Sequence, residues 1–191
     1  MTLPSEPKSI APVDCTVGGL LHLLQAEAII TRKQSDDARK LAPVTAEELK
    51  RAAKRAGGRQ ASHQPSPGEI LARMGMRDPE GDVINENRIA ECFANAAGFR
   101  YVKLDPLKLD SSLVTETLSL PFALRNSVLP IALDPERIII ATDDPYAIET
   151  LEQIRNITQR KVEVWISSRS DILRILKDLY GFRTSVAQAA N

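Results

Sequence analysis

The sequence has no excess of either charge and no long hydrophobic run. Twenty-five basic and 25 acidic residues give a formal net charge of zero. This balance argues against nucleic acid or an anionic membrane as a partner bound through bulk electrostatics. No apolar segment approaches the roughly 20 residues that span a bilayer, and the N-terminus lacks the basic-then-apolar order of a signal peptide. We therefore expect a cytoplasmic protein that binds no nucleic acid and is not inserted directly in a membrane.

Metal-binding and catalytic patterns are also missing. Cys15 and Cys92 belong to no CxxC pair, so we expect two reduced thiols rather than a metal site or a disulfide. Neither His22 nor His63 has an aspartate or cysteine at a metal-ligand spacing, and His22 is expected to be an interfacial or a satisfied core residue. No G-x-x-x-x-G-K-[ST] phosphate-binding loop occurs. The sequence assigns no catalytic residue and no metal, and we expect a module that is not an enzyme.

Two adjacent carboxylates, Asp143 and Asp144, could suggest catalysis or a metal. Asp144 is followed by Pro145, which suits the first position of a helix because proline has no N–H to leave unbonded there. A carboxylate just before that position caps the helix. The capping role explains one of the two acids without any chemistry, so we do not take the pair as catalytic.

The stretch from 128 to 180 carries the clearest structural pattern. Residues 128–133 and 138–142 are apolar runs rich in β-branched residues, and the D-P-E-R turn between them predicts two paired strands. Apolar residues at a spacing of three then predict a helix, residues 161–167 return to strand alternation, and 168–180 predict a last helix that Gly181 can terminate. Two strands joined by a helical crossover are expected to be parallel.

Before Gly98 every apolar pattern has helical spacing, and after it strands and helices alternate. We expect the α+β or α/β class: a helical N-terminal subdomain followed by a small α/β sandwich with a roughly four-stranded mixed sheet. The expected division is a flexible lead-in over 1–14, the helical subdomain over 15–97 with a loop or linker near 57–67, the α/β subdomain over 98–181 and a linker stub over 182–191. The sheet is expected to use strands at 101–104, 128–133, 138–142 and 162–166, over a shared core of Ile131, Ile139, Ile148, Leu151, Ile154, Val164, Ile172, Ile175 and Leu176.

Three local features carry further predictions, and the last two leave alternatives open. Pro43 is expected to end one helix, and Thr45 with Glu48 to begin another. Trp165 is expected on the strand face opposite to Val164 and Ile166, so it is either a half-exposed partner contact or covered by a helix. The densest basic cluster is either a solvated helix face, which we favour because no aromatic residues interleave, or a phosphate-binding patch; it comprises Lys50, Arg51, Lys54, Arg55 and Arg59.

Residues 138–181 resemble the N-terminal domain of the type II secretion and type IV pilus assembly ATPases, the family of GspE and MshE. That family has, in this order, a "vAt.DP" strand end, an amphipathic helix ending near Thr-Gly, a "v.p.v" strand and an "I...I...Y.G" helix. Gln159 stands where the family usually has glycine. The resemblance runs through Leu104, Pro130, Ala141, Thr142, Asp144, Pro145, Ile154, Thr158, Ile172, Ile175, Tyr180 and Gly181.

An imperfect repeat occurs in the first half. T-V-G-G-L-L at Thr16 and S-P-G-E-I-L at Ser66 share a skeleton, and a helix start follows each at I-T or I-N. The skeleton resembles the tandem motif of MshE-type domains, R-L-G-x-x-L-V-x-x-G-x-I-T, which in that family binds cyclic di-GMP. Here the arginine positions hold Thr16 and Ser66, so the packing skeleton is kept and the ligand-holding arginines are not. We favour a structural repeat; were a dinucleotide bound, its contacts would be Gly18, Leu21, Gly68, Leu71 and Gly75.

The resemblance implies a non-catalytic adaptor or regulatory module. It would dock a secretion or pilus motor onto the cytoplasmic domain of an inner-membrane platform protein, and it would thereby be associated peripherally with that membrane. An ATPase domain would lie C-terminal to it, so the chain would be a truncated piece or a stand-alone module. No cofactor is expected, and the alternative function is a cyclic di-GMP sensor of the MshE type.

Overall fold

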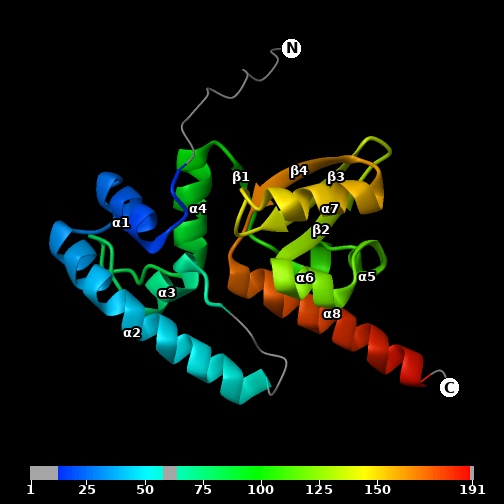
Figure 1. Cartoon of the computed structure of the whole chain (residues 1–191), viewed down its shortest axis with the longest axis horizontal. Helices are drawn as coiled ribbons and strands as arrows, with labels where there is room; N and C mark the ends of the chain where they lie inside the picture. The colour runs from blue at the N-terminus through cyan, green and yellow to red at the C-terminus, as the bar shows by residue number, and fades with distance from the viewer. Residues whose placement is uncertain (1–12, 58–63, 190–191) are drawn as a thin grey trace, which may run out of the picture.

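The computed structural model describes residues 13–57 and 64–189, which form a helical half and an α/β half side by side (Figure 1). The first 12 residues of the expected lead-in lie outside the described residues. So does most of the expected linker, together with Arg59 and His63.

The helical half consists of α1 (Val17–Ala26), α2 (Arg32–Gly57), α3 (Pro67–Arg73) and α4 (Glu86–Ala97). Each short helix turns its leucines or isoleucines inward, and these side chains meet in one core because the apolar positions recur at helical spacing. The fully buried members include Leu21, Leu24, Leu71, Ile84 and Ile89. His22 lies on the exposed side of α1, so the expectation of a core residue is wrong.

The expected break at Pro43 is also wrong, because α2 is one helix of 26 residues with Pro43 inside it. A proline within a helix removes one backbone hydrogen bond and crowds the preceding turn. Here Pro43 is exposed, so the freed carbonyl can face water. The Thr45 hydroxyl, expected to cap a new helix, instead donates to the Leu41 carbonyl at 3.1 Å within the same helix.

The α/β half begins at Gly98, which ends α4 in the left-handed conformation with φ 75°. Its elements are β1 (Arg100–Tyr101), η2 (Pro106–Lys108), α5 (Ser111–Thr117), α6 (Leu120–Asn126), β2 (Val128–Leu133), β3 (Arg137–Thr142), α7 (Ile148–Thr158), β4 (Lys161–Ile166) and α8 (Arg169–Ala189). The four strands have the order β1-β4-β3-β2. β4 is parallel to both β1 and β3, while β2 is antiparallel to β3. The expected fold class and mixed sheet are confirmed.

Helices cover both faces of this sheet (Figure 1). On one face Ile138 and Ile140 pack with Ile154 of α7. On the other face Ala141 packs with the α8 stripe Ile172, Ile175 and Leu176. The alternating directions of successive side chains in β3 explain why one strand serves two cores.

The helix α7 departs from expectation at both ends. It begins at Ile148 without a side-chain cap, and the Asp144 carboxylate instead accepts from the Tyr146 N–H at 2.9 Å in a turn before the helix. Ile154 is fully buried, but Ile148 is 70% exposed and Ile157 is 56% exposed. A spacing of three falls short of the 3.6-residue turn, so each step rotates the side chain by about 60° and a four-residue stripe leaves the core at its ends.

Three smaller differences complete the fold. The helix α8 continues through Gly181 to Ala189, because a single glycine weakens a helix without ending it. β1 is two residues long, although the Val102 N–H still bonds the Ile166 carbonyl at 2.8 Å. Trp165 is half-buried under the guanidinium of Arg100, which lies 3.9 Å from the ring centroid. A cation, rather than a helix, therefore stacks on the tryptophan.

Candidate functional site

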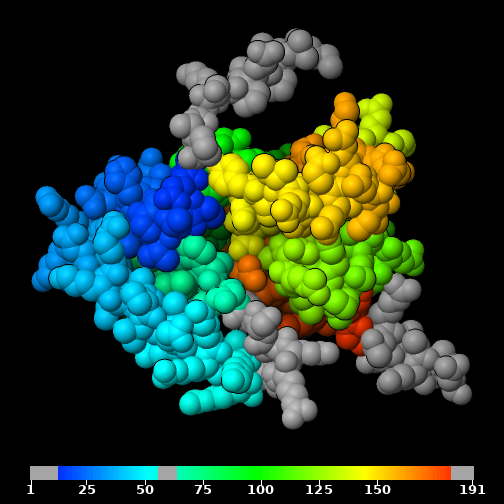
Figure 2. All heavy atoms as spheres, viewed as in Figure 1, coloured from blue at the N-terminus to red at the C-terminus, as the bar shows by residue number. Residues whose placement is uncertain are grey.

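The two halves meet around a cavity of about 280 Å³. Its walls come from the segment before α1, the start of α3, one side of α4, the end of β3 and the connection from β4 to α8. Figure 2 shows α3, the end of β3 and the start of α8 converging at this place on the surface. Concave sites between subdomains are where ligands and partners preferentially bind, so the junction is the candidate functional site.

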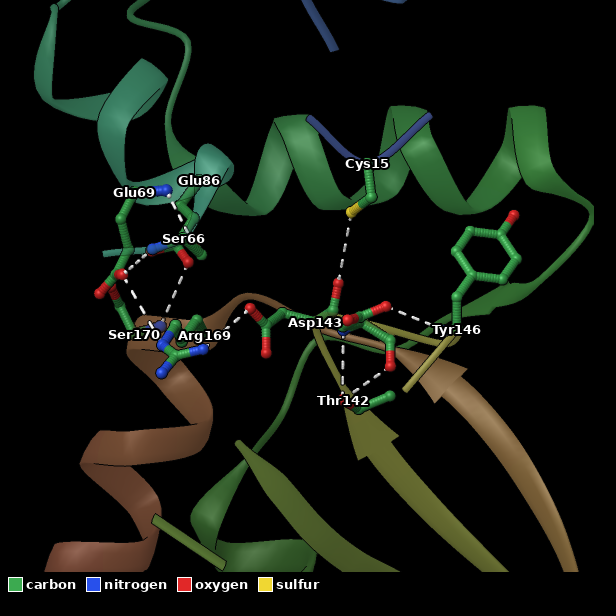
Figure 3. A network of polar contacts seen from close by, with 10 residues as sticks. Cys15, Ser66, Glu69, Glu86, Thr142, Asp143, Tyr146, Arg169 and Ser170 are labelled. Carbon is green, nitrogen blue, oxygen red and sulfur yellow. Dashed lines mark hydrogen bonds and ion pairs between the residues drawn. The ribbon is translucent and has the colours of Figure 1, made fainter. Parts of the chain in front are cut away.

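Arg169 lies at the centre of the junction, in the first turn of α8 (Figure 3). Its guanidinium is 3.7 Å from Oε2 of Glu69 in the helical half and 3.5 Å from Oδ2 of Asp143 in the α/β half. All three side chains are about 15% exposed: 16% for Arg169, 14% for Glu69 and 15% for Asp143. One buried cation therefore links carboxylates that belong to different halves.

Local capping fixes the position of Glu69. The Ser66 hydroxyl accepts from the Glu69 N–H at 3.2 Å, and the Glu69 carboxylate accepts from the Ser66 N–H at 2.7 Å. This capping box holds the first turn of α3 so that the same carboxylate faces Arg169. The carboxylate is thus shared between a helix cap and an ion pair.

A second group of polar contacts joins α4 to the start of α8. The Ser170 N–H donates to Glu86 at 3.3 Å, and the Asn87 amide donates to Asp171 at 3.0 Å. The Tyr101 hydroxyl in turn donates to Asn87 at 3.1 Å. Glu86 near the N–H groups of a helix start is a favourable placement for a carboxylate.

Burial at the junction shifts the affinity of several groups for protons. Removal from water raises the pKa of Asp143, and the nearby Arg169 only partly opposes this shift. Burial likewise raises the pKa of Glu86, with a smaller contribution from the negative charge of Glu69. The Cys15 thiol donates weakly to the Asp143 carbonyl at 3.9 Å; its burial, followed by the charges of Asp144 and Asp143, raises its pKa to about 12. Burial at the junction thus favours the protonated, uncharged forms of Asp143, Glu86 and Cys15.

The imperfect repeat predicted from the sequence is present as structure. Thr16 and Ser66, at the two arginine positions of the motif, are the N-caps of α1 and α3, and each hydroxyl accepts a backbone N–H. Ala28 and Gly75 both adopt the left-handed conformation in the turns that follow, with φ 55° and 63°. Both copies therefore repeat a capped helix and a left-handed turn, and their cap side chains are engaged with the backbone.

The five tentative nucleotide contacts do not gather in one place. Leu21 and Leu71 are fully buried in the helical core. Gly18 lies beside the guanidinium of Arg39, Gly75 has open space around it, and Gly68 alone lines the junction cavity. The structure therefore assigns the leucines to packing and brings one of the five residues to the candidate site.

Sequence reasoning singled out Asp143 but missed Arg169, Glu69 and Glu86. One signal was available for Arg169: a basic residue in the first turn of a helix is unfavourable to the helix dipole and calls for a nearby anion. Nothing in the spacing shows that the anion comes from residue 69, a hundred positions earlier. Within residues 13–57 and 64–189, no group of three or more histidine, cysteine or acidic side chains could hold a metal ion.

Comparison with known proteins gives consistent similarities. A family model described as the MshEN domain matches residues 97–186. The type IV pilus assembly ATPase TfpB of Acinetobacter baylyi (strain ATCC 33305 / BD413 / ADP1) is 30% identical over 105 residues, which cover 54% of this chain and 18% of TfpB. The chain thus spans less than a fifth of the length of this curated relative.

Two solved structures are similar to nearly the whole chain. The structure of MshE with cdg is 19% identical with a TM-score of 0.52, and the match covers 84% of this chain and 98% of that one. The structure of the N-terminal domain of XpsE is 19% identical with a TM-score of 0.43, over 83% of this chain and 92% of that one. The likeness to MshE extends the similarity of fold beyond the α/β half into the helical half.

Proposed function

We propose that the chain is a non-catalytic docking module of a type II secretion or type IV pilus assembly ATPase, because residues 97–186 match the MshEN domain and TfpB is 30% identical. The observation that carries this proposal is the family match over residues 97–186, which includes β3, α7, β4 and most of α8. ATP hydrolysis would be performed by a C-terminal ATPase domain of the full-length protein.

The proposed partner is the cytoplasmic domain of an inner-membrane platform protein. Docking onto it would hold the motor at the cytoplasmic face of that membrane, so the association would be peripheral and through protein contacts. None of the described helices is long and apolar enough to cross a bilayer. The balanced charge of the chain also favours protein contacts over attraction to anionic lipid.

Isothermal titration calorimetry tests the docking proposal directly. The chain is titrated with the purified cytoplasmic domain of the platform protein at tens of micromolar, and saturable one-to-one binding with a micromolar or tighter Kd is expected. Circular dichroism establishes that the sample is folded. The absence of heat from a folded sample, in both directions of titration, contradicts the proposal.

For the repeat in the helical half, cyclic di-GMP binding is the competing function. The paired capped helices and left-handed turns favour it, as does the fold shared with MshE, whose structure contains cdg. Against it stand Thr16 and Ser66, because a capping hydroxyl cannot replace an arginine that pairs with phosphate or stacks on guanine. We therefore propose that the repeat is structural here.

Titration of the chain with cyclic di-GMP decides between these two. No heat and no thermal shift are expected up to about 100 μM ligand, which bounds the Kd well above the micromolar range. A saturable signal that disappears when Gly68 is replaced by a bulky residue would establish the sensor instead. The docking titration is independent of this result.

We also propose that the boundary between the subdomains lies between 97 and 98. The left-handed Gly98 separates α4 from β1 at that point. The expected helical range of 15–97 and α/β range of 98–181 then remain the working division. The continuation of α8 to Ala189 extends the second range toward the C-terminus.

A further inference from the structure

The junction between the halves has an apolar side and a polar side. On the apolar side, Ile166 of β4 is 1% exposed and packs within the helical core. Tyr146 meets Phe93 and Phe99 edge-on, with ring centroids 6.3 Å and 6.0 Å apart. On the polar side the contacts converge on the start of α8 (Figure 3). Only the contacts on the polar side depend on charge. A change of charge there would therefore leave the apolar contacts in place.

Among the described residues that line the cavity, Arg169 is the only basic one. Acidic residues reach the junction from different elements: Glu69 from α3, Glu86 from α4, and Asp143 and Asp144 from the segment after β3. Within α8, Asp171 is paired with Arg174 at 2.8 Å and bonded to Asn87. Cys15 approaches from the segment before α1. Without the guanidinium, none of the described residues that line the cavity would place a cation beside Asp143.

We propose that Arg169 is a releasable latch: its guanidinium holds Glu69 of the helical half against Asp143 of the α/β half, and withdrawal of this charge opens the junction cavity. The apolar contacts of Ile166 and Tyr146 would remain and serve as the pivot. This device goes beyond docking to a platform protein, since it concerns how the two halves of the module are held together. It applies whichever partner binds.

Two features indicate that the ion pairs of Arg169 are weak enough to separate. The contacts of Arg169 with Glu69 and Asp143 are longer than the 2.7 to 2.9 Å typical of strong charge-assisted hydrogen bonds. A positive charge in the first turn of a helix is also disfavoured by the helix dipole. The net attraction that holds the Glu69 and Asp143 carboxylates near Arg169 is therefore small. Breaking such a partly buried pair by removing one partner leaves an uncompensated charge, which favours opening.

The reactivity of the two native cysteines measures opening of the junction, so no labelling site has to be introduced. Cys15 lines the cavity and contacts the Asp143 carbonyl across the junction, while Cys92 is buried in the helical core. Opening of the junction exposes Cys15 and relieves the raised pKa of its thiol, whereas Cys92 stays protected. Unfolding of the helical half exposes both. The ratio of the two alkylation rates therefore separates the latch from general destabilisation.

The test compares N-ethylmaleimide labelling of Cys15 and Cys92, quantified by peptide mass spectrometry, in four forms of the chain. Arg169→Gln removes the cation, and Glu69→Gln removes one anion while keeping a residue type that completes a capping box. Arg174→Gln is the matched control, since Arg174 lies on the same helix but its side chain is 52% exposed. The wild-type chain gives the baseline.

Arg169→Gln and Glu69→Gln are each expected to raise the Cys15 rate about tenfold or more, with the Cys92 rate unchanged. Arg174→Gln is expected to leave both rates at the wild-type level. The latch is rejected if neither junction variant accelerates Cys15. It is equally rejected if the Cys15 and Cys92 rates rise together, or if Arg174→Gln matches Arg169→Gln.

Discussion

The helical half and the α/β half encode their structures in different ways. In the α/β half, the buried side chains and the family pattern coincide: Ile154, Ile172 and Ile175 belong to both. In the helical half the repeat survives as caps and turns, while the positions that hold ligand in related motifs carry Thr16 and Ser66. The family pattern in the α/β half consists of packed side chains, whereas the repeat in the helical half consists of caps and turns. We therefore expect core substitutions to test the α/β half, and cap or turn substitutions to test the repeat.

The largest expected effect is in the sheet core. Ile154→Ala removes a fully buried side chain between α7 and β3 and should lower the free energy of unfolding by about 2 to 5 kcal/mol. Leu49→Ala, on the half-exposed side of α2, should cost visibly less. Urea denaturation measures both. Equal and mild effects would contradict a sheet-centred core.

Capping comes next, at the two helix starts of the repeat in the helical half. Thr16→Ala and Ser66→Ala should each lower stability by about 1 kcal/mol, because each hydroxyl accepts a backbone N–H at a helix start. Ser119→Ala is the matched control in the α/β half, since Ser119 is the N-cap of α6 but makes no side-chain cap bond. A loss at Ser119 as large as at Thr16 would show that these differences do not come from capping.

Left-handed turns give a smaller effect of opposite sign. Ala28→Gly should raise stability by about 0.5 to 1 kcal/mol, because a side chain in the left-handed region is strained and glycine is not. Gln159→Gly, at φ 54° after α7, should gain somewhat less because its side-chain bond to the Asn156 carbonyl is lost. Thermal unfolding of both variants beside Gly75→Ala, which should lose stability, checks the sign. A loss in both glycine variants would contradict this account.

The least disruptive test concerns the junction and pH. The pKa of Glu86 is raised in the folded chain above its ordinary value of 4.5, so the ionised carboxylate opposes folding as the pH rises through the folded pKa. Glu86→Gln removes this ionisation and keeps an acceptor for the Ser170 N–H. The variant should be more stable than the wild type at pH 7 and equal to it below about pH 4, where both side chains are neutral. A difference independent of pH, measured by urea melts, would exclude burial of the charge as its cause.

The sequence predicted most of the elements and the fold class, but not the junction. Period and turn chemistry are local, and they placed β2, β3 and β4 correctly. The error at Pro43 arose because an exposed proline can remain inside a helix, and the error at Ile148 because a spacing of three drifts around the helix. The contacts of Arg169 join residues about a hundred positions apart, and no periodic pattern records such a pairing.

Ile166 has a consequence for the order in which the chain folds. It lies in the last strand, yet its side chain completes the core of the helical half. During synthesis that core leaves the ribosome about 70 residues before Ile166 does, and domains made at 5 to 20 residues per second generally fold as units. For several seconds, until β4 has been synthesised, the part of the helical core that Ile166 covers therefore remains exposed. Its final packing is gained only together with the sheet, so the two halves form one cooperative unit despite their separate architectures.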